Sequence, residues 1–228
     1  MASEKKTTIQ LLDNLIAELE LAVGKDEPPA PVKKETTKKE KNEKKGEQKA
    51  PAAAKVEEEL TVNSIDLRVG IIRKVSKHPT AEKLYCEEID IGEEAPREIA
   101  SGLVPYYTLA QMQDRKLIVV CNLKPRNLVG FKSNGMVLCA SKTNPDGSSS
   151  VEFVDPPANS QPGDRIIGEG LSGEPLTATK CDKLKAFEVV AADLKVDERG
   201  VANWKGHRLT TLAGEAVTAP TLRDAHLR

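Results

Sequence analysis

The chain has 228 residues, of which 39% are apolar, and its 34 basic residues stand against 35 acidic ones. This length holds one large or two small domains, and the apolar content suffices for a packed core. Because the total charge is balanced, any electrostatic attraction for nucleic acid must come from local clusters. No apolar run approaches the length of a membrane span, and the N-terminus lacks the apolar centre of a secretory signal. We therefore expect a cytoplasmic protein without a membrane partner.

Cysteine usage fits a reducing compartment. The four cysteines show no C-x-x-C spacing, and three of them lie in or beside apolar stretches, where a thiol behaves as a small hydrophobe. We expect reduced thiols, no zinc or other metal, and no cofactor. The cysteines are Cys86, Cys121, Cys139 and Cys181.

Residues 1–24 are the first predicted element, an amphipathic helix. Thr7 or Thr8 can cap its start, Gly24 follows its end, and its apolar residues recur three or four positions apart. A short helix alone is marginally stable in water, so it should fray or dock. It can fold back on its own domain, but the long segment behind it favours docking on another protein or on a copy of itself. The apolar residues are Ile9, Leu12, Leu15, Ile16, Leu19 and Val23.

Residues 25–60 differ in composition from the rest of the chain, with several prolines, three consecutive alanines and no aromatic residue. Such a segment cannot bury enough apolar surface to fold, and we predict a disordered linker rich in Lys, Pro and Ala. Between residues 33 and 49 it carries eight lysines against four glutamates. Two interpretations stand: a solvated tether, or a loose polycation that binds RNA phosphates without sequence preference.

Residues 61–164 change to a pattern of short strands. Five such strands with a helix after the third are typical of a small Greek-key barrel of the OB type, an all-β fold that commonly binds oligonucleotides. One or two helical turns at 106–112 supply the helix. The five strands are predicted at residues 62–75, 84–91, 97–103, 117–123 and 136–141, with a further element near 151–154.

Residues 165–228 follow as a smaller α+β region. Apolar residues at helical spacing predict a helix over 182–193. Short strands are predicted near 194–196, 201–204 and 207–211. The single tryptophan, Trp204, is expected to anchor a core or an interface between domains.

A basic segment lies between the fourth and fifth predicted strands, with Lys124, Arg126 and Lys132 within nine positions. A loop that is merely kept in solution by its charges would have the same spacing. The composition favours a phosphate-binding loop, because Gly130 and Gly135 let the backbone approach a ligand and several Asn and Ser side chains offer neutral donors and acceptors.

Several motifs in one order resemble the tRNA-binding domain of the endothelial monocyte-activating polypeptide II type. That domain occurs in auxiliary proteins of the synthetase complex, in small bacterial tRNA-binding proteins, and attached to methionyl- and tyrosyl-tRNA synthetases. The likeness covers residues 61–228. The matching residues are Asp66-Leu67-Arg68-Val69-Gly70, His78-Pro79 with Ala81 and Leu84, Ser101-Gly102-Leu103-Val104, Asn122-Leu123-Lys124-Pro125, and Ser133-Asn134-Gly135-Met136 leading to Cys139-Ala140-Ser141.

The resemblance implies an OB-fold tRNA-binding domain at 61–164 and a C-terminal extension at 165–228 that packs on the barrel as a second subunit would. It also implies a non-catalytic auxiliary factor that delivers or retains tRNA for an aminoacyl-tRNA synthetase or a synthetase complex, on which the N-terminal helix docks. An alternative is a protein-interaction or cytokine-like signalling module released by cleavage in the exposed linker.

The residues expected to contact tRNA lie mainly in the basic segment. Its cations would neutralise phosphates, Arg126 as a fork on one phosphate, while Ser133 and Asn134 would bond sugar or base edges. Met136 has two interpretations, an RNA contact or a residue of the barrel core. The full set is Lys124, Arg126, Lys132, Ser133, Asn134 and Met136, with Arg97 and Ser101 on the adjoining strand.

No catalytic constellation is evident, and we expect neither an enzyme nor a small-molecule substrate. The three histidines are far apart in sequence, no phosphate-binding G-x-x-x-x-G-K-[ST] motif occurs, and His78 is expected to shape the loop after the first strand. Aromatic residues make up only 3% of the chain. Since barrels that bind single strands stack bases on several exposed rings, this composition favours recognition of folded RNA through shape, phosphates and 2′-hydroxyls.

Overall fold

The computed structural model describes residues 60–228. The predicted docking helix at 1–24 and the predicted linker at 25–60 lie outside the described residues, apart from Leu60. Within the described part the protein is mostly β-sheet with a few short helices, as the strand patterns predicted. None of the helices described there is long and apolar enough to cross a bilayer.

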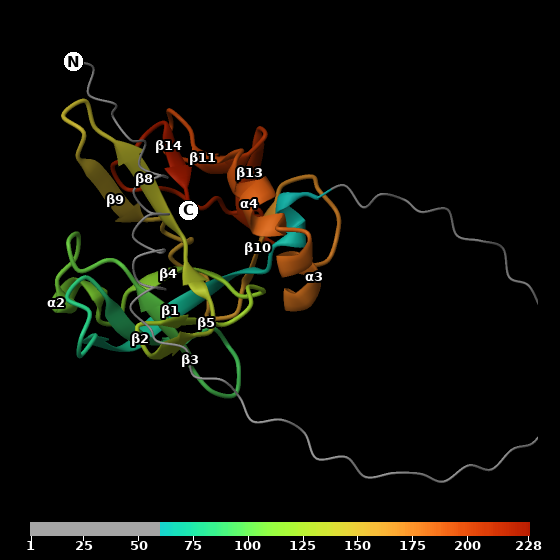
Figure 1. The fold of residues 1–228 in the computed structure, drawn as a ribbon. Coiled ribbons are helices and arrows are strands. Elements are labelled where there is room, and N and C mark those ends of the chain that lie inside the picture. The colour runs from blue at the N-terminus through green and yellow to red at the C-terminus, as the bar shows by residue number, and fades with distance from the viewer. Residues whose placement is uncertain (1–59) are drawn as a thin grey trace, which may run out of the picture. The chain divides into compact units, whose positions relative to one another are not determined.

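The strands pair antiparallel throughout the described residues, in one twelve-stranded network and one separate hairpin (Figure 1). The helical elements are η1 (Val62–Ser64), α2 (Leu109–Met112), α3 (Ala178–Lys183) and α4 (Ala186–Ala191). The strands are β1 (Leu67–Lys77), β2 (Tyr85–Asp90), β3 (Arg97–Ser101), β4 (Lys116–Val120), β5 (Arg126–Leu128), β6 (Phe131–Ser133), β7 (Met136–Val137), β8 (Cys139–Thr143), β9 (Ser149–Phe153), β10 (Arg165–Gly168), β11 (Leu194–Val196), β12 (Ala202–Trp204), β13 (His207–Thr211) and β14 (Ala225–Leu227).

Strand β1 organises the first part of the sheet. It pairs with β4 and β10 near its start and with β2 over the rest of its length, and a register shift at Ile72 to Lys74 lets it bend between them. The sheet β3-β2-β1-β4-β7 curls like a barrel but does not close through a continuous ladder. Instead, the Ala100 N–H donates to Ser133 Oγ (3.0 Å) and the Asn134 N–H donates to the Glu98 carbonyl (2.8 Å).

Strand β4 is buried on both faces, which explains its uninterrupted apolar sequence. Leu117 and Val119 belong to the core enclosed by the curled sheet, together with Tyr85 and Phe153. Ile118 and Val120, on the opposite face, belong to a second core. Residues from α3 to β14 complete that second core, so the C-terminal region covers the outer face of β4. These C-terminal contributors are Cys181, Ala186, Val190, Leu194, Val196, Ala202, Trp204, Leu209, Val217, Ala219, Ala225 and Leu227.

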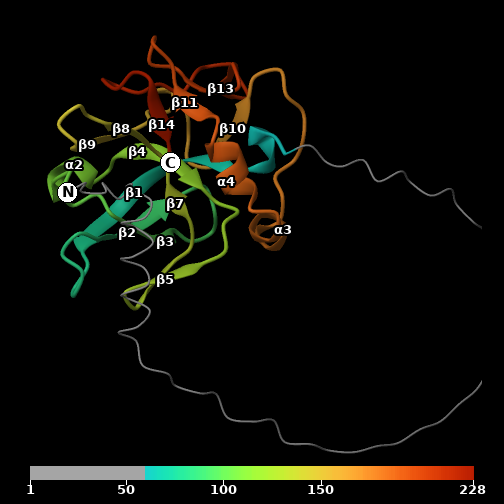
Figure 2. The same cartoon turned by 45° about the horizontal axis from the view of Figure 1, so that its top comes forward.

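The C-terminal region supplies strands β11 to β14, which continue the network onto β8 and β9 (Figures 1 and 2). Trp204 is buried and donates its indole N–H to the Val190 carbonyl (3.1 Å), which confirms its role as a core anchor. The prediction of one helix over 182–193 is wrong. Two short helices, α3 and α4, replace it, because Lys185 between them adopts the left-handed conformation with φ 48° and ends the helical path.

Two buried asparagines connect the N-terminal end of the sheet to the segment before α3. Asn122 accepts the Asp66 N–H (3.0 Å) at Oδ1 and donates from Nδ2 to the carbonyls of Ser64 (3.0 Å) and Leu176 (2.9 Å). Asn63 accepts the Gly168 N–H (2.8 Å) and donates to the Leu171 carbonyl (3.0 Å). Backbone groups in these irregular segments would otherwise be buried without partners, so the two amides hold the segments in place.

Replacing Asn122 by Ala should lower the free energy of unfolding by on the order of 3 kcal/mol, because the Asp66 N–H and the Leu176 carbonyl would lose their side-chain partner and the Ser64 carbonyl would keep only the Leu176 N–H. Urea denaturation of the two proteins measures the difference. Asn127→Ala is the matched control, since Asn127 is exposed and its side chain has no recorded hydrogen bond within residues 60–228; it should change the value by less than about 0.5 kcal/mol. Equal stability of the two variants would contradict this account of Asn122.

Candidate nucleic-acid interface

The basic segment folds into the two-stranded hairpin β5–β6. Its register places Arg126 opposite Ser133, Asn127 opposite Lys132, and Leu128 opposite Phe131. The connecting residues Val129 and Gly130 both have positive φ, 51° and 89°, as a type I′ turn requires. The glycine is suited to this conformation, whereas a β-branched residue is strained there, and Val129 is also half exposed.

The hairpin divides the predicted cations between two faces. Because side chains alternate along a strand, Arg126 lies on the face of Leu128 and Ser133, and Lys132 lies on the opposite face. Both cations are exposed, and neither forms a salt bridge or side-chain hydrogen bond recorded for residues 60–228. Both are therefore available to a ligand, but one flat surface would not contact both head groups equally.

Lys124 has a carboxylate partner on the C-terminal region. Its Nζ lies 2.6 Å from Oδ2 of Asp182 in α3, and both side chains remain about half exposed. An exposed ion pair of this kind is weak, so an RNA phosphate could replace Asp182 at little cost. Lys124 thus forms an ion pair that links the sheet to α3. Its role in tRNA binding stays a prediction.

Ser133 and Met136 face the protein interior to different degrees. Ser133 is buried, and its hydroxyl accepts the Ala100 N–H (3.0 Å) and donates to the Gly135 carbonyl (3.0 Å), which attaches β6 to β3. Met136 is partly buried and packs on the second core. Because Gly135 has no side chain, Ile99 and the Val120 carbonyl can pack within 3.0 Å of the position that a Cβ would occupy. The glycine therefore allows close packing within the protein, and not the approach of a ligand.

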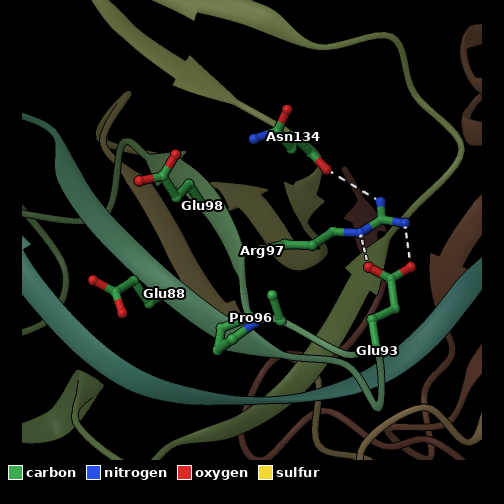
Figure 3. Close-up of a pocket in the computed structure, with 7 residues that line it drawn as sticks. Glu88, Glu93, Pro96, Arg97, Glu98 and Asn134 are labelled. Carbon is green, nitrogen blue, oxygen red and sulfur yellow. Dashed lines mark hydrogen bonds and ion pairs between the residues drawn. The ribbon is translucent and has the colours of Figure 1, made fainter.

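Arg97 lies in a depression of about 610 Å³ whose lining includes three glutamates (Figure 3). Its guanidinium donates to both carboxylate oxygens of Glu93 (2.8 and 2.6 Å) and to the carbonyls of Cys121 (2.7 Å) and Asn134 (3.2 Å). The hydrogen bond to Glu93 raises the pKa of Arg97 and lowers the pKa of Glu93. Glu88, which pairs with Lys74, and Glu98 also line the depression, so that three carboxylates and one guanidinium are among its lining residues. Arg97 here fixes the path of residues 121 and 134, and the Asn134 side chain stays partly exposed.

Ser101, the other predicted site residue on β3, is buried and donates its hydroxyl to Glu87. Glu87 is itself buried inside the curled sheet, where its second carboxylate oxygen has no partner. Burial raises the pKa of Glu87 to about 7, against the opposing effect of the Ser101 hydrogen bond. Ser101 therefore contacts the interior of the sheet in this structure.

The side of the hairpin that carries Arg126 faces α3 and α4 across a groove of about 630 Å³. The sequence patterns did not single out Lys185 and Phe187, which line this groove from the C-terminal region. The three lysines between residues 180 and 185 could have indicated a second basic segment. The apolar positions at helical spacing in the same region predicted only a helix. Among the described residues, no three His, Cys, Asp or Glu side chains are grouped as metal ligands.

Comparison with known proteins places the hairpin inside a recognised type of domain, the tRNA binding domain. The family model of the tRNA binding domain matches residues 67–165, which include the whole hairpin. The crystal structure of the C-terminal domain of Plasmodium vivax p43 has 32% sequence identity and a TM-score of 0.66, and the match covers 73% of this chain and 98% of that one. The chain belongs to the tRNA-binding domain family of the endothelial monocyte-activating polypeptide II type.

Two further relatives are much longer than the part that matches this chain. Cytoplasmic methionine–tRNA ligase of Caenorhabditis elegans is 44% identical over 204 residues, which are 90% of this chain and 22% of that protein. Aminoacyl tRNA synthase complex-interacting multifunctional protein 1 of Cricetulus griseus is 39% identical over 198 residues, 86% of this chain and 53% of that protein. The chain thus spans from about a fifth to about half the length of these relatives, and the matched binding domain makes up residues 67–165 of this chain.

Replacing Val129 by Asn should raise the free energy of unfolding by about 1 kcal/mol, because asparagine tolerates the left-handed conformation better than a β-branched residue and Val129 buries little surface in return. Thermal denaturation of both proteins tests this. The control Val189→Asn removes an equally exposed valine from helix α4, where φ is not positive, and should not stabilise the protein. A destabilised Val129→Asn protein would show that valine makes contacts that outweigh the strain.

Glu87 should make stability depend on pH between about 4.5 and 7. The carboxyl ionises near 4.5 when unfolded and near 7 when folded, so in this window the folded state holds more protons and the free energy of unfolding falls as pH rises. The loss is on the order of 3 kcal/mol and is complete above pH 7. Urea denaturation of Glu87→Gln should show a smaller fall over this window and greater stability than the parent at pH 8. Parallel curves for the two proteins would refute the raised pKa.

Proposed function

We propose that this chain is a non-catalytic tRNA-binding auxiliary factor that retains or delivers tRNA for an aminoacyl-tRNA synthetase or a synthetase complex. The observation that carries the proposal is the hairpin β5–β6. It lies inside the matched tRNA binding domain, and its exposed Arg126 and Lys132 have no recorded ion-pair partner among residues 60–228. Cations that are not neutralised by the protein are available to phosphate oxygens.

We also propose a division of the fold into two parts. We take residues 61–164 as an OB-fold tRNA-binding domain and residues 165–228 as an extension that covers it in the way a second subunit would. The second core supports this division, because it joins the outer face of β4 to the C-terminal strands. A face that is apolar on β4 would otherwise need another protein to cover it.

The packing of three aromatic rings inside the curled sheet supports folded RNA as the ligand. Tyr85 and Phe153 are buried, and Tyr107 packs on Phe153 with ring centroids 4.4 Å apart. A single-strand binder would expose such rings for stacking. Arg126, on one face of the hairpin, and Lys132, on the other, would instead contact phosphates on either side of the projecting strand pair, as a hairpin inserted between two backbone strands does.

Residues 1–60 complete the proposed mechanism. The amphipathic helix at 1–24 would bind a synthetase or a scaffold of the complex, and the lysine-rich linker at 25–60 would attract tRNA without sequence preference. The two activities on one chain would raise the tRNA concentration near the enzyme without catalysis by this chain. The relatives support this setting, since they are tRNA ligases or carry the synthase complex in their name. Their names also place the first of them in the cytoplasm, where we expect this chain.

The double variant Arg126→Gln/Lys132→Gln tests the hairpin. In the full chain it should reduce the slope of log K against log salt for tRNA by about 1.5, since each phosphate contact contributes roughly 0.7 to 0.9. Unfolding should be unchanged, because both side chains are exposed. The matched control is Lys195→Gln/Arg199→Gln, which removes the same charges from β11 and the turn after it. An identical slope in the two double variants would place the tRNA site elsewhere.

The same titration on a chain without residues 25–60 measures the share of the linker. A smaller slope, with the effect of the hairpin variant preserved, is the expected result, because two separate cationic segments contribute independently. An unchanged slope would remove the linker from the binding mechanism and leave it as a tether.

A further inference from the structure

The groove between the hairpin and the C-terminal helices has the composition of a site for one nucleotide. Its volume of about 630 Å³ lies within the range of sites that enclose small organic ligands. One wall comes from β5, β6 and the start of β7, and the other from α3 and α4. The lining residues include Leu123, Arg126, Leu128, Lys185, Phe187 and Glu188.

The walls combine an apolar surface with a ring. Leu123 and Phe187 are partly buried against the second core, and Leu128 lies across from them on the hairpin. Phe187 is the one aromatic residue among those that line this groove. An aromatic face among aliphatic side chains suits the flat, weakly hydrated face of a base. This apolar wall has no group that binds a phosphate. A ligand that contacts both this wall and the cations of the groove must therefore carry an aromatic part and an anionic part.

Two cations lie on opposite walls of the groove. Arg126 is on the hairpin and Lys185 is between the two helices; both are exposed, and neither forms an ion pair recorded for residues 60–228. Lys124 is already paired with Asp182. Of the two carboxylates that line the groove, Asp182 is paired and Glu188 has no ion pair recorded within the described residues. Glu188 can therefore accept a hydrogen bond from an amino group or a ribose hydroxyl. Cations opposite each other match an anionic linkage that passes between them.

The backbone at Lys185 provides independent support. Its φ of 48° and ψ of 40° are left-handed, a conformation in which glycine is relaxed and a lysine is strained. Lys205 is strained in the same way, with φ 48°, but its ammonium lies over the Trp204 ring at 4.8 Å and 3.5 Å from Asp193. Lys185 has no such recorded contact in the described chain. A strained lysine without a protein partner, in a groove, is placed for a ligand.

We propose that this groove binds one unpaired nucleotide of the RNA held by the hairpin, which rests on the proposed function above. The base lies against Phe187 and the apolar wall, the phosphates on either side of it contact Arg126 and Lys185, and Glu188 accepts from the base or the ribose. A paired nucleotide cannot enter, because its base is held inside the duplex. The groove therefore adds preference for unpaired ends or loops to a domain that otherwise contacts phosphates.

The test compares two RNAs on the full chain: a blunt-ended duplex, and the same duplex with a short 3′ overhang. The parent should bind the overhang RNA about fivefold or more tightly than the blunt one, the effect of stacking one base. Phe187→Leu should reduce this preference to less than about twofold without changing affinity for the blunt duplex. Lys185→Gly should reduce the preference as well, while thermal unfolding stays the same or shifts upward because glycine relieves the strain.

Lys205→Gly is the matched control, since it removes the same charge from the same backbone conformation outside the groove. It should keep the overhang preference of the parent. If Lys185→Gly and Lys205→Gly retain equal preference while Arg126→Gln/Lys132→Gln still weakens tRNA binding, the groove proposal is overturned and the proposed function stands. If the parent binds neither RNA nor tRNA, the proposed function itself fails.

Discussion

The outer face of strand β4 is the constraint on which the rest of the structure depends. Ile118 and Val120 point away from the curled sheet and must be covered. Burial of each of these two side chains stabilises the folded protein by about 1.5 to 3 kcal/mol. If they were exposed, the apolar face would favour association with another protein. The C-terminal region provides the cover, and this brings α3 and α4 opposite the hairpin. The groove is thus a consequence of how the barrel-like sheet buries its second face.

Most of the fold of residues 61–164 could be predicted from the sequence, because strand patterns bounded by turn residues are local information. The strands near 84–91, 97–103 and 117–123 are present within a few residues. The start of the first strand was misplaced, since Val62 to Ser64 form a single 3₁₀ turn. His78 shapes its loop as expected, with Nδ1 accepting the N–H groups of Thr80 and Ala81. The helix at 182–193 was wrong because apolar periodicity does not report the left-handed residue that divides it.

The site was harder to predict, because side-chain partners depend on contacts distant in sequence. Arg97 and Asn134 are 37 positions apart, and Lys124 and Asp182 are 58 apart, so neither contact has a local signal. Burial of Ser101 and Ser133 likewise follows from strand register across the sheet. What sequence does provide is the density of cations in one connecting segment. The structure adds that Arg126 and Lys132 belong to different faces, so tRNA would have to surround the hairpin rather than lie on it.

The joint between the sheet and the C-terminal region is made mainly of apolar contacts, of the strand pairings β1–β10 and β8–β14, and of buried hydrogen bonds. These hydrogen bonds come from the amides of Asn63 and Asn122 and from Thr221 and Leu222 to the buried Glu152 carboxylate, while the Lys124 ion pair lies at the exposed margin. Ions in the medium screen exposed charges strongly and affect such amides and apolar contacts little. A rise in ionic strength would therefore detach a bound polyanion while the protein remains folded and ready for another. Binding of a polyanion and folding of the protein would therefore depend on different forces, so that the affinity could change without a change in stability.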